Sequence, residues 1–242
     1  LKKTSQTLFP FRTRIENRCA LHGCARINTG KRKTPYKGVG HNLEYQSGER
    51  LEIAAMTDGE IVNYNNIATD CWVSAHTVKE YFSILEDTLI GYTIPAYTKT
   101  IKRRVVQSPK FYLFDVGLTN YLLHRKEVVK GTPEYGHAFE HFVMQELMAY
   151  IRYNRKEEKL CYWRTSTGLE VDAVIGDKLA IEIKSTEDVQ PKHIKNLKAF
   201  KEEHPDFKLM VVSLDNISRN LGDVEQLYIY DFLQQLWAGL LF

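Results

Sequence analysis

The sequence has few cysteines and lacks a long hydrophobic run. Four cysteines in 242 residues, none in a C-x-x-C pair, exclude a disulfide-rich scaffold. No apolar stretch approaches the length of a membrane span, and no signal-peptide core is evident, so we expect a cytoplasmic protein that does not enter membranes. One group could form a zinc site, but its spacing matches no common structural zinc pattern: Cys19, His22, Cys24 and His41. A phosphate-binding P-loop is also absent, because Arg32 stands where that motif needs Ser or Thr.

Positive charge is concentrated near the N-terminus. Residues 1–48 contain ten Lys/Arg and two acidic residues, a net +8 in a chain whose total is +3, so the remaining residues sum to −5. This segment has no sustained hydrophobic period and is interrupted by glycine and proline, which predicts a poorly packed basic head. A nucleic-acid-binding arm is the alternative interpretation. The acidic remainder argues against a partner recruited by overall positive charge.

Residues 49–130 have the pattern of a winged-helix-like segment. Asn63 and Ser74 are predicted caps of two short helices, 64–70 and 75–85. Two capped helices joined by a short turn are typical of a helix-turn-helix unit. Trp72 occupies the turn position that usually holds Gly, because positive φ is often needed there, so we do not expect the standard turn geometry.

A basic hairpin follows the two helices. The strands predicted at 88–94 and 110–115 bracket four side chains that can contact phosphates: Lys99, Lys102, Arg103 and Arg104. The second helix itself offers few basic residues, and the negative charge of Glu80 offsets theirs. Packing or docking of subunits is therefore the alternative to DNA binding for this segment.

Glycine and proline at 126–136 predict a domain boundary, followed by a second domain over residues 137–242. The pattern predicts a helix and an antiparallel meander, then a helix and a strand, in the order 138–150, 160–165, 169–175, 179–185, 190–203 and 208–214. This order predicts an α/β fold with a mixed sheet flanked by helices. Aromatic residues in the C-terminal helix, such as Trp237, indicate packing or association between copies of the chain.

Charged residues interrupt two of these strands. Because side chains alternate along a strand, Val171, Ala173 and Ile175 should face one way, and Asp172 and Val174 the other. Glu182 and Lys184 should likewise share a face, opposite Ile181 and Ile183. If the strands pair, the two carboxylates and the ammonium lie side by side. Burying such charges costs several kcal/mol unless they are paired or bound to a metal.

Two carboxylates, from Asp172 and Glu182, together with waters, suit an octahedral Mg²⁺ or Mn²⁺ ion. Such an ion lowers the pKa of a bound water and offsets charge on a phosphoryl transition state. We expect Lys184 to hold or deprotonate the attacking water. Glu140, on the preceding helix, is expected to complete the metal shell or orient a bound water, and Arg164 to contact phosphate.

These residues carry a resemblance to a known superfamily. Glu140, then Glu170-Val171-Asp172, then Ile181-Glu182-Ile183-Lys184-Ser185 resembles the PD-(D/E)XK nucleases, with Val171 in place of the proline that names the motif. The resemblance implies a restriction-endonuclease-like fold, with Asp172, Glu182 and Glu140 as metal ligands and Lys184 as a catalytic residue. It implies metal-dependent hydrolysis of phosphodiester bonds in DNA.

The wider stretch 50–230 resembles the C-terminal part of bacterial and archaeal AAA-type ATPases. The residues that carry this resemblance are 81–87, Tyr-Phe-Ser-Ile-Leu-Glu-Asp, and 108–118, Ser-Pro-Lys-Phe-Tyr-Leu-Phe-Asp-Val-Gly-Leu. The ATPase module is absent, so it is implied as a partner. Two alternatives to an active nuclease stay open. The fold can persist with Lys184 merely neutralising Asp172 and Glu182, or it can serve as a DNA- or protein-binding accessory domain.

Overall fold

The computed structural model describes residues 46–99 and 103–242, with side chains from residue 51 onward. Lys102 and nearly all of the basic head, including the candidate zinc residues Cys19 to His41, lie outside the described residues. Contacts within the chain divide it after Glu52, and residues 53–242 form one compact unit. That unit contains every other residue singled out from the sequence. The division into segments 49–130 and 137–242 stays a prediction.

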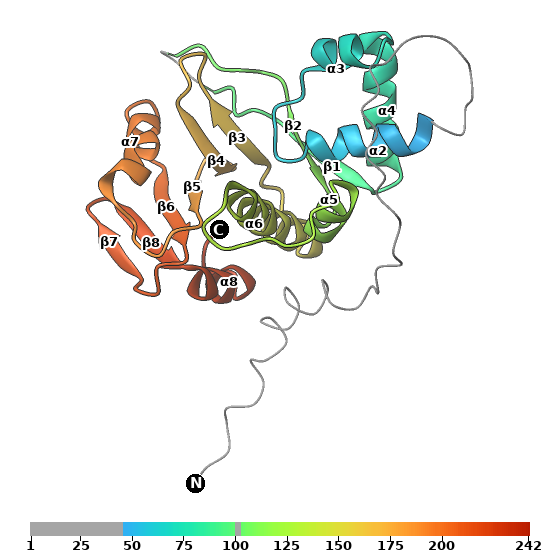
Figure 1. Ribbon diagram of the computed structural model, residues 1–242. Helices are drawn as coiled ribbons and strands as arrows, with labels where there is room; N and C mark the ends of the chain where they lie inside the picture. The colour runs from blue at the N-terminus through green and yellow to red at the C-terminus, as the bar shows by residue number, and fades with distance from the viewer. Residues whose placement is uncertain (1–45, 100–102) are drawn as a thin grey trace. The chain divides into compact units, whose positions relative to one another are not determined.

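The protein is a mixed α/β structure (Figure 1). The described helices are α2 (Gln46–Met56), α3 (Tyr64–Asp70), α4 (Ala75–Asp87), α5 (Val116–Leu122), α6 (Pro133–Tyr153), the 3₁₀ helix η1 (Pro191–Ile194), α7 (Lys195–Lys201) and α8 (Ile229–Trp237). The strands are β1 (Gly91–Ile94), β2 (Lys110–Leu113), β3 (Leu160–Arg164), β4 (Glu170–Ile175), β5 (Leu179–Lys184), β6 (Lys208–Ser213), β7 (Arg219–Leu221) and β8 (Val224–Tyr228). None of the described helices is long and apolar enough to cross a membrane.

Helices α3 and α4 begin where the sequence predicts. The Asn63 side chain accepts a hydrogen bond from the Asn66 amide, and Ser74 accepts one from the Thr77 amide. Between the helices, Trp72 has φ of +55° and is 94% exposed. The prediction of a non-standard turn is therefore wrong for the backbone of Trp72, which has the positive φ that this position usually needs. The backbone keeps the left-handed conformation without glycine, at a cost of about 1–2 kcal/mol.

The main sheet has six strands in the order β3-β4-β5-β6-β8-β7. Strands β3, β4 and β5 form the predicted antiparallel meander, whereas β6 and β8 continue the sheet in parallel with β5. Helices α6 and α8 cover one face, and η1 and α7 cover the other (Figure 1). The sheet therefore has a buried core on each side, as its apolar central strands require.

Helix α6 starts five residues earlier than predicted, at Pro133. Thr132 caps it by accepting a hydrogen bond from the Tyr135 amide, and proline fits the first helical position because its missing N–H needs no partner there. The helix therefore includes Gly136, although the sequence pattern assigned this glycine to a boundary loop. The earlier start brings His137 into the first turns of a continuous helix that reaches Tyr153.

A second, two-stranded sheet pairs β1 with β2 in antiparallel register, Gly91 opposite Leu113. The described parts of the connection between them do not project freely as a basic wing. Ala96 forms a bridge with Tyr162, and Val105 forms one with Thr165, so the connection runs along the outer edge of β3. The two helices and the strand pair expected of a winged helix are therefore present, but the described residues do not form a free wing.

Two glycines test this packing. A Cβ at Gly91 would lie 2.3 Å from the Phe111 ring and 2.9 Å from the Tyr112 carbonyl oxygen, whereas one at Gly136 would meet only the Ser185 Oγ at 3.4 Å. We expect Gly91→Ala to lower the free energy of unfolding by about 1–3 kcal/mol through overpacking. Gly136→Ala should raise it by up to about 1 kcal/mol, because alanine favours a helix. Urea unfolding of both variants measures the difference, and equal stabilities would contradict this account of β1.

Candidate functional site

A β-bulge positions Asp172 in β4. Trp163 pairs with Val171 and Cys161 with Val174, so Asp172 and Ala173 together oppose the single residue Tyr162. Strict alternation along β4, expected from the sequence, is therefore wrong: Val171 and Val174 pack on the α7 side, and Ala173 packs on the α6 side. The bulge leaves the Asp172 carboxylate beside β5, where Oδ2 accepts a hydrogen bond from the Ile183 amide at 2.7 Å.

Strand β5 alternates as predicted. Ile181 and Ile183 pack in the α6 core, while Glu182 and Lys184 share the opposite face. Lys184 Nζ lies 2.7 Å from Glu182 Oε1 and 3.6 Å from Asp172 Oδ2. The three residues that the sequence singled out therefore meet at one place.

Glu140 joins this cluster through a residue that the sequence analysis missed. Lys110, at the start of β2, is only 3% exposed, and its Nζ lies 2.7 Å from Glu170 Oε1 and 3.4 Å from Glu140 Oε1. The Tyr112 hydroxyl donates a hydrogen bond of 2.9 Å to Glu140 Oε1. A lysine in the otherwise apolar strand Lys-Phe-Tyr-Leu was the available signal, because a buried ammonium requires acidic partners.

Burial and neighbouring negative charges disfavour the ionised forms of Asp172 and Glu182. Burial, together with the charge of Asp172, raises the pKa of Glu182 to about 8 despite the nearby Lys184. Burial and the charge of Glu140 raise the pKa of Asp172 to about 6. For Glu140, burial also acts upward, but Lys110 and the Tyr112 hydroxyl outweigh it and lower the pKa. The cluster therefore holds a proton near neutral pH on the Asp172–Glu182 pair.

The same charges keep Lys184 protonated. Burial lowers its pKa, but the charges of Asp172 and Glu182 outweigh burial and raise the pKa above the usual value. In this arrangement Lys184 is a cation at neutral pH. It can hold a water or a phosphate oxygen, but it cannot take a proton. Of the two roles expected from the sequence, holding the attacking water therefore remains and deprotonating it does not.

One buried atom has no hydrogen-bond partner in this cluster: Glu182 Oε2. Around it, the carboxylates of Glu140, Glu170, Asp172 and Glu182 face the cations Lys110, Lys184 and Arg164. With one proton held on the Asp172–Glu182 pair, the three basic groups balance the remaining negative charge. An oxygen without a partner, in a carboxyl pair that holds a proton, fits a cation that replaces this proton.

The predicted metal ligands are not drawn together as tightly as a preformed site requires. Over the described residues, Asp172, Glu182 and Glu140 do not bring three oxygens within 4.8 Å of one another. Lys184 lies against Asp172 and Glu182, and Lys110 and Tyr112 hold Glu140. A cation at this place would therefore have to displace the Lys184 ammonium from at least one carboxylate.

The predicted nucleic-acid contacts are mostly engaged within the chain. Lys99 pairs with Asp177 at 2.6 Å, and the two terminal nitrogens of Arg103 lie 2.6 Å from Glu202 and Glu203. Of the two further predicted residues, Arg104 is exposed beside the outer edge of β3. Arg164, the last residue of β3, pairs with Glu170 at 2.9 Å.

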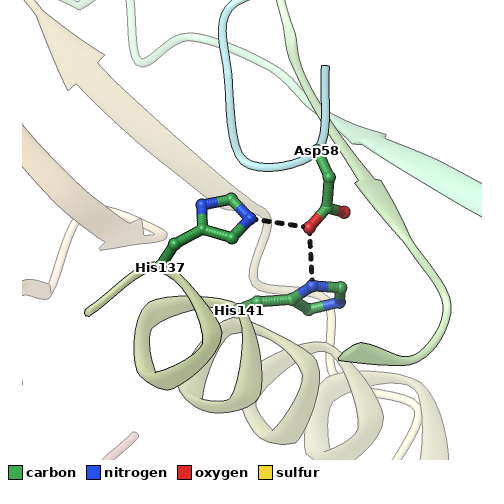
Figure 2. Close-up of side chains that lie close together, drawn as sticks. All are labelled: Asp58, His137 and His141. Atoms are coloured by element: carbon green, nitrogen blue, oxygen red, sulfur yellow. Dashed lines mark hydrogen bonds and ion pairs between the residues drawn. The ribbon is translucent and has the colours of Figure 1, made fainter. Parts of the chain in front are cut away.

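A second cluster of ionisable groups involves residues that the sequence analysis did not select. Asp58, after α2, contacts His137 and His141, which extend from neighbouring turns of α6 (Figure 2). One donor atom from each residue lies within 4.8 Å of the other two. The available signal was the spacing of the histidines, because side chains four residues apart share one face of a helix.

Comparison with known proteins identifies two adjoining matches. Residues 46–128 match the family model of a domain of unknown function, DUF8612, and residues 135–232 match that of another, DUF4143. Uncharacterized proteins from Mycobacterium tuberculosis and Mycobacterium bovis are each 29% identical to this chain over 133 residues, which is 53% of this chain and 29% of theirs. No solved structure matches. The Asp172, Glu182, Lys184 cluster thus lies in the DUF4143 match, and its partner Lys110 lies in the DUF8612 match.

Proposed function

We propose that the cluster of Asp172, Glu182 and Lys184 hydrolyses phosphodiester bonds in DNA with a bound Mg²⁺ or Mn²⁺ ion. The proposal includes a restriction-endonuclease-like fold for the domain that begins with α6 and a winged-helix origin for the preceding segment. The observation that carries it is the buried Glu182 Oε2, which has no hydrogen-bond partner although Lys184 lies 2.7 Å from the other oxygen of the same carboxylate. A structural ion-pair network would be expected to satisfy that oxygen.

Each residue has a role in this proposal. The carboxylates of Asp172 and Glu182 would hold the ion, and the Ile183 amide would orient Asp172 through its hydrogen bond to Oδ2. When bound, the ion lowers the pKa of a coordinated water and offsets charge on the phosphoryl group. Lys184, released from one carboxylate, would hold the attacking water or a phosphate oxygen. Glu140, fixed by Tyr112, would orient a second water.

One observation favours an alternative function. Lys184 Nζ already lies 2.7 Å from Glu182 Oε1, as expected if the fold persists without chemistry. The alternative is a non-catalytic module that binds DNA or protein, such as an accessory domain for an ATPase partner. The two functions differ in whether the cluster binds a divalent ion and whether Lys184 is needed for turnover.

The first prediction concerns metal binding and pH. A divalent ion must displace the proton that Glu182, with its pKa of about 8, holds at neutral pH. Mn²⁺ affinity should therefore rise from pH 6 to about pH 8 and then level off. Calorimetry in buffers of different ionisation enthalpy should show proton release at pH 7. Glu182→Gln should abolish binding at this site, whereas Glu187→Gln, at an exposed position, should not change it.

The pH dependence of stability in the metal-free protein provides a second test of the raised pKa of Glu182. The pKa of Glu182 rises from its ordinary 4.5 to about 8, so folding favours the protonated form. Its contribution to stability is full below pH 4.5 and is lost as the pH rises through 8. Glu182→Gln should flatten this part of the stability profile. If Glu182→Gln changes neither the pH dependence of stability nor the Mn²⁺ affinity, the proposed metal site is contradicted.

The next prediction separates catalysis from binding. Lys184→Ala should lower the rate of metal-dependent DNA cleavage by about a hundredfold or more, because a positioned electrostatic group is lost at the reacting phosphate. DNA affinity should stay within a few-fold of wild type. Lys178→Ala, an exposed lysine that pairs with Glu158, is the matched control and should cleave normally.

Wild-type protein that binds DNA but cleaves neither single-stranded, duplex nor branched DNA with Mg²⁺ or Mn²⁺ would favour the binding module. Cleavage that persists in Lys184→Ala would indicate another active site or a contaminating nuclease. Circular dichroism of each variant ensures that a loss of cleavage does not reflect unfolding.

Arg104 offers a test of where the protein contacts DNA phosphates. Arg104 is exposed beside the outer edge of β3, where its carbonyl accepts a hydrogen bond from the Ser166 amide. If DNA lies along this edge, Arg104→Ala should weaken binding and reduce the slope of log affinity against log salt by about one unit. Lys192→Ala, on η1, which packs against β5, is the control. Equal salt dependence in the two variants would place the DNA elsewhere.

A further inference from the structure

The carboxylate of Asp58 is held in place from two sides. The Leu113 amide donates a hydrogen bond of 2.7 Å to Oδ1, while Oδ2 faces His137 Nε2 and His141 Nδ1, each at 2.9 Å (Figure 2). Asp58 is 2% exposed and His141 is completely buried, whereas the side chain of His137 is 23% exposed. Gly59 makes this approach possible, because a Cβ there would lie 2.6 Å from the His137 ring.

The hydrogen bonds of His141 show that a proton or a metal ion must lie between its Nδ1 and Asp58. Its Nε2 lies 2.9 Å from the Leu113 carbonyl oxygen, which can only accept, so Nε2 carries the hydrogen. In a neutral imidazole, Nδ1 then presents a lone pair directly to Asp58 Oδ2 at 2.9 Å. Two electron pairs at that distance repel each other unless a proton or a metal ion lies between them.

The same features meet the requirements of a transition-metal site. His137 and His141 are four residues apart on α6, a spacing that presents two imidazoles to one ion. A metal-bound histidine usually donates its other N–H to a carbonyl or carboxylate, as His141 does to Leu113. Donor atoms of a tetrahedral zinc site are about 3.3 Å apart, given bonds of about 2.0 Å. The 2.9 Å contacts would therefore have to open by only a few tenths of an ångström.

We propose that Asp58, His137 and His141 bind a divalent transition-metal ion of the zinc class. Two imidazoles and one carboxylate favour zinc, nickel or copper over Mg²⁺ and Ca²⁺, which prefer oxygen ligands alone. A water bound on the partly exposed side of His137 completes four-coordination. The site is distinct from the Asp172 and Glu182 cluster, where all the protein ligands are carboxylates.

The role of this ion is structural. The spacing from His137 to His141 is H-x-x-E-H, which in some metalloproteases places a glutamate beside zinc as the general base. Here the Glu140 carboxylate instead contacts Lys110 and the Tyr112 hydroxyl. No base is therefore presented to a metal-bound water by this motif. The ion would join the loop after α2, the end of β2 and the N-terminal part of α6.

The test uses the full chain, stripped of metal with a chelator and then titrated with Zn²⁺ or Co²⁺. Wild type should bind one Zn²⁺ tightly and unfold at a higher temperature when loaded. Bound Co²⁺ should give visible absorption bands typical of four-coordination. His137→Gln and His141→Gln should each weaken binding by more than about a hundredfold, because losing a supporting residue alone costs about 10–100-fold.

Two controls make the result specific. His76→Gln removes an exposed histidine that pairs with Glu80 on α4 and should leave Zn²⁺ binding unchanged. Asp172→Asn should also leave it unchanged while abolishing Mn²⁺ binding at the candidate active site, so failure of one proposal is distinguishable from failure of the other.

Two outcomes would overturn the inference. The first is folded wild-type protein that binds no stoichiometric Zn²⁺, in which case no metal ion lies between Asp58 and the two histidines. The second is unchanged Zn²⁺ affinity and an unchanged cobalt spectrum in His137→Gln. Because His137 is partly exposed, this variant is expected to fold, and circular dichroism verifies that it does.

Discussion

The ion pairs of the buried Lys110 connect the parts of this structure that carry candidate chemistry. An ammonium that is 3% exposed is tolerated only when acidic groups surround it, and its partners come from two other elements, Glu140 from α6 and Glu170 from β4. The pairing therefore fixes β2 against the helix and the sheet. Lys110 also lowers the pKa of Glu140, and burial together with the charge of Glu140 raises the pKa of Asp172.

Helix α6 serves both clusters of ionisable groups. Glu140 faces Lys110 and Tyr112, while His137 and His141, one turn apart, face Asp58. A small rotation or shift of α6 would therefore change both sets of distances together. This arrangement gives a physical reason for coupling between the proposed metal site and the candidate active site, because one rigid element carries ligands of each.

The outer edge of β3 shows how intramolecular charge pairing changes the interpretation of a basic segment. Counted along the sequence, the cations between β1 and β2 suggest a wing that contacts phosphate. In the folded chain Lys99 pairs with Asp177, and Arg103 pairs with Glu202 and Glu203. These pairs attach the segment to the sheet, whereas Arg104 is exposed and forms no ion pair among the described residues.

The sequence by itself determined the features that depend on local periodicity and capping. The caps Asn63 and Ser74, the antiparallel meander and the shared face of Glu182 and Lys184 all follow from rules that act over a few residues. Only the tertiary structure decided the bulge that turns Asp172 toward β5 and the left-handed backbone at Trp72. It also decided the partners of the buried charges: Lys110 meets Glu140 from 30 residues away, and Asp58 meets His141 from 83. Such partners cannot be read from a local pattern, because the free energy that selects them arises from desolvation and charge pairing between segments that are adjacent only after folding.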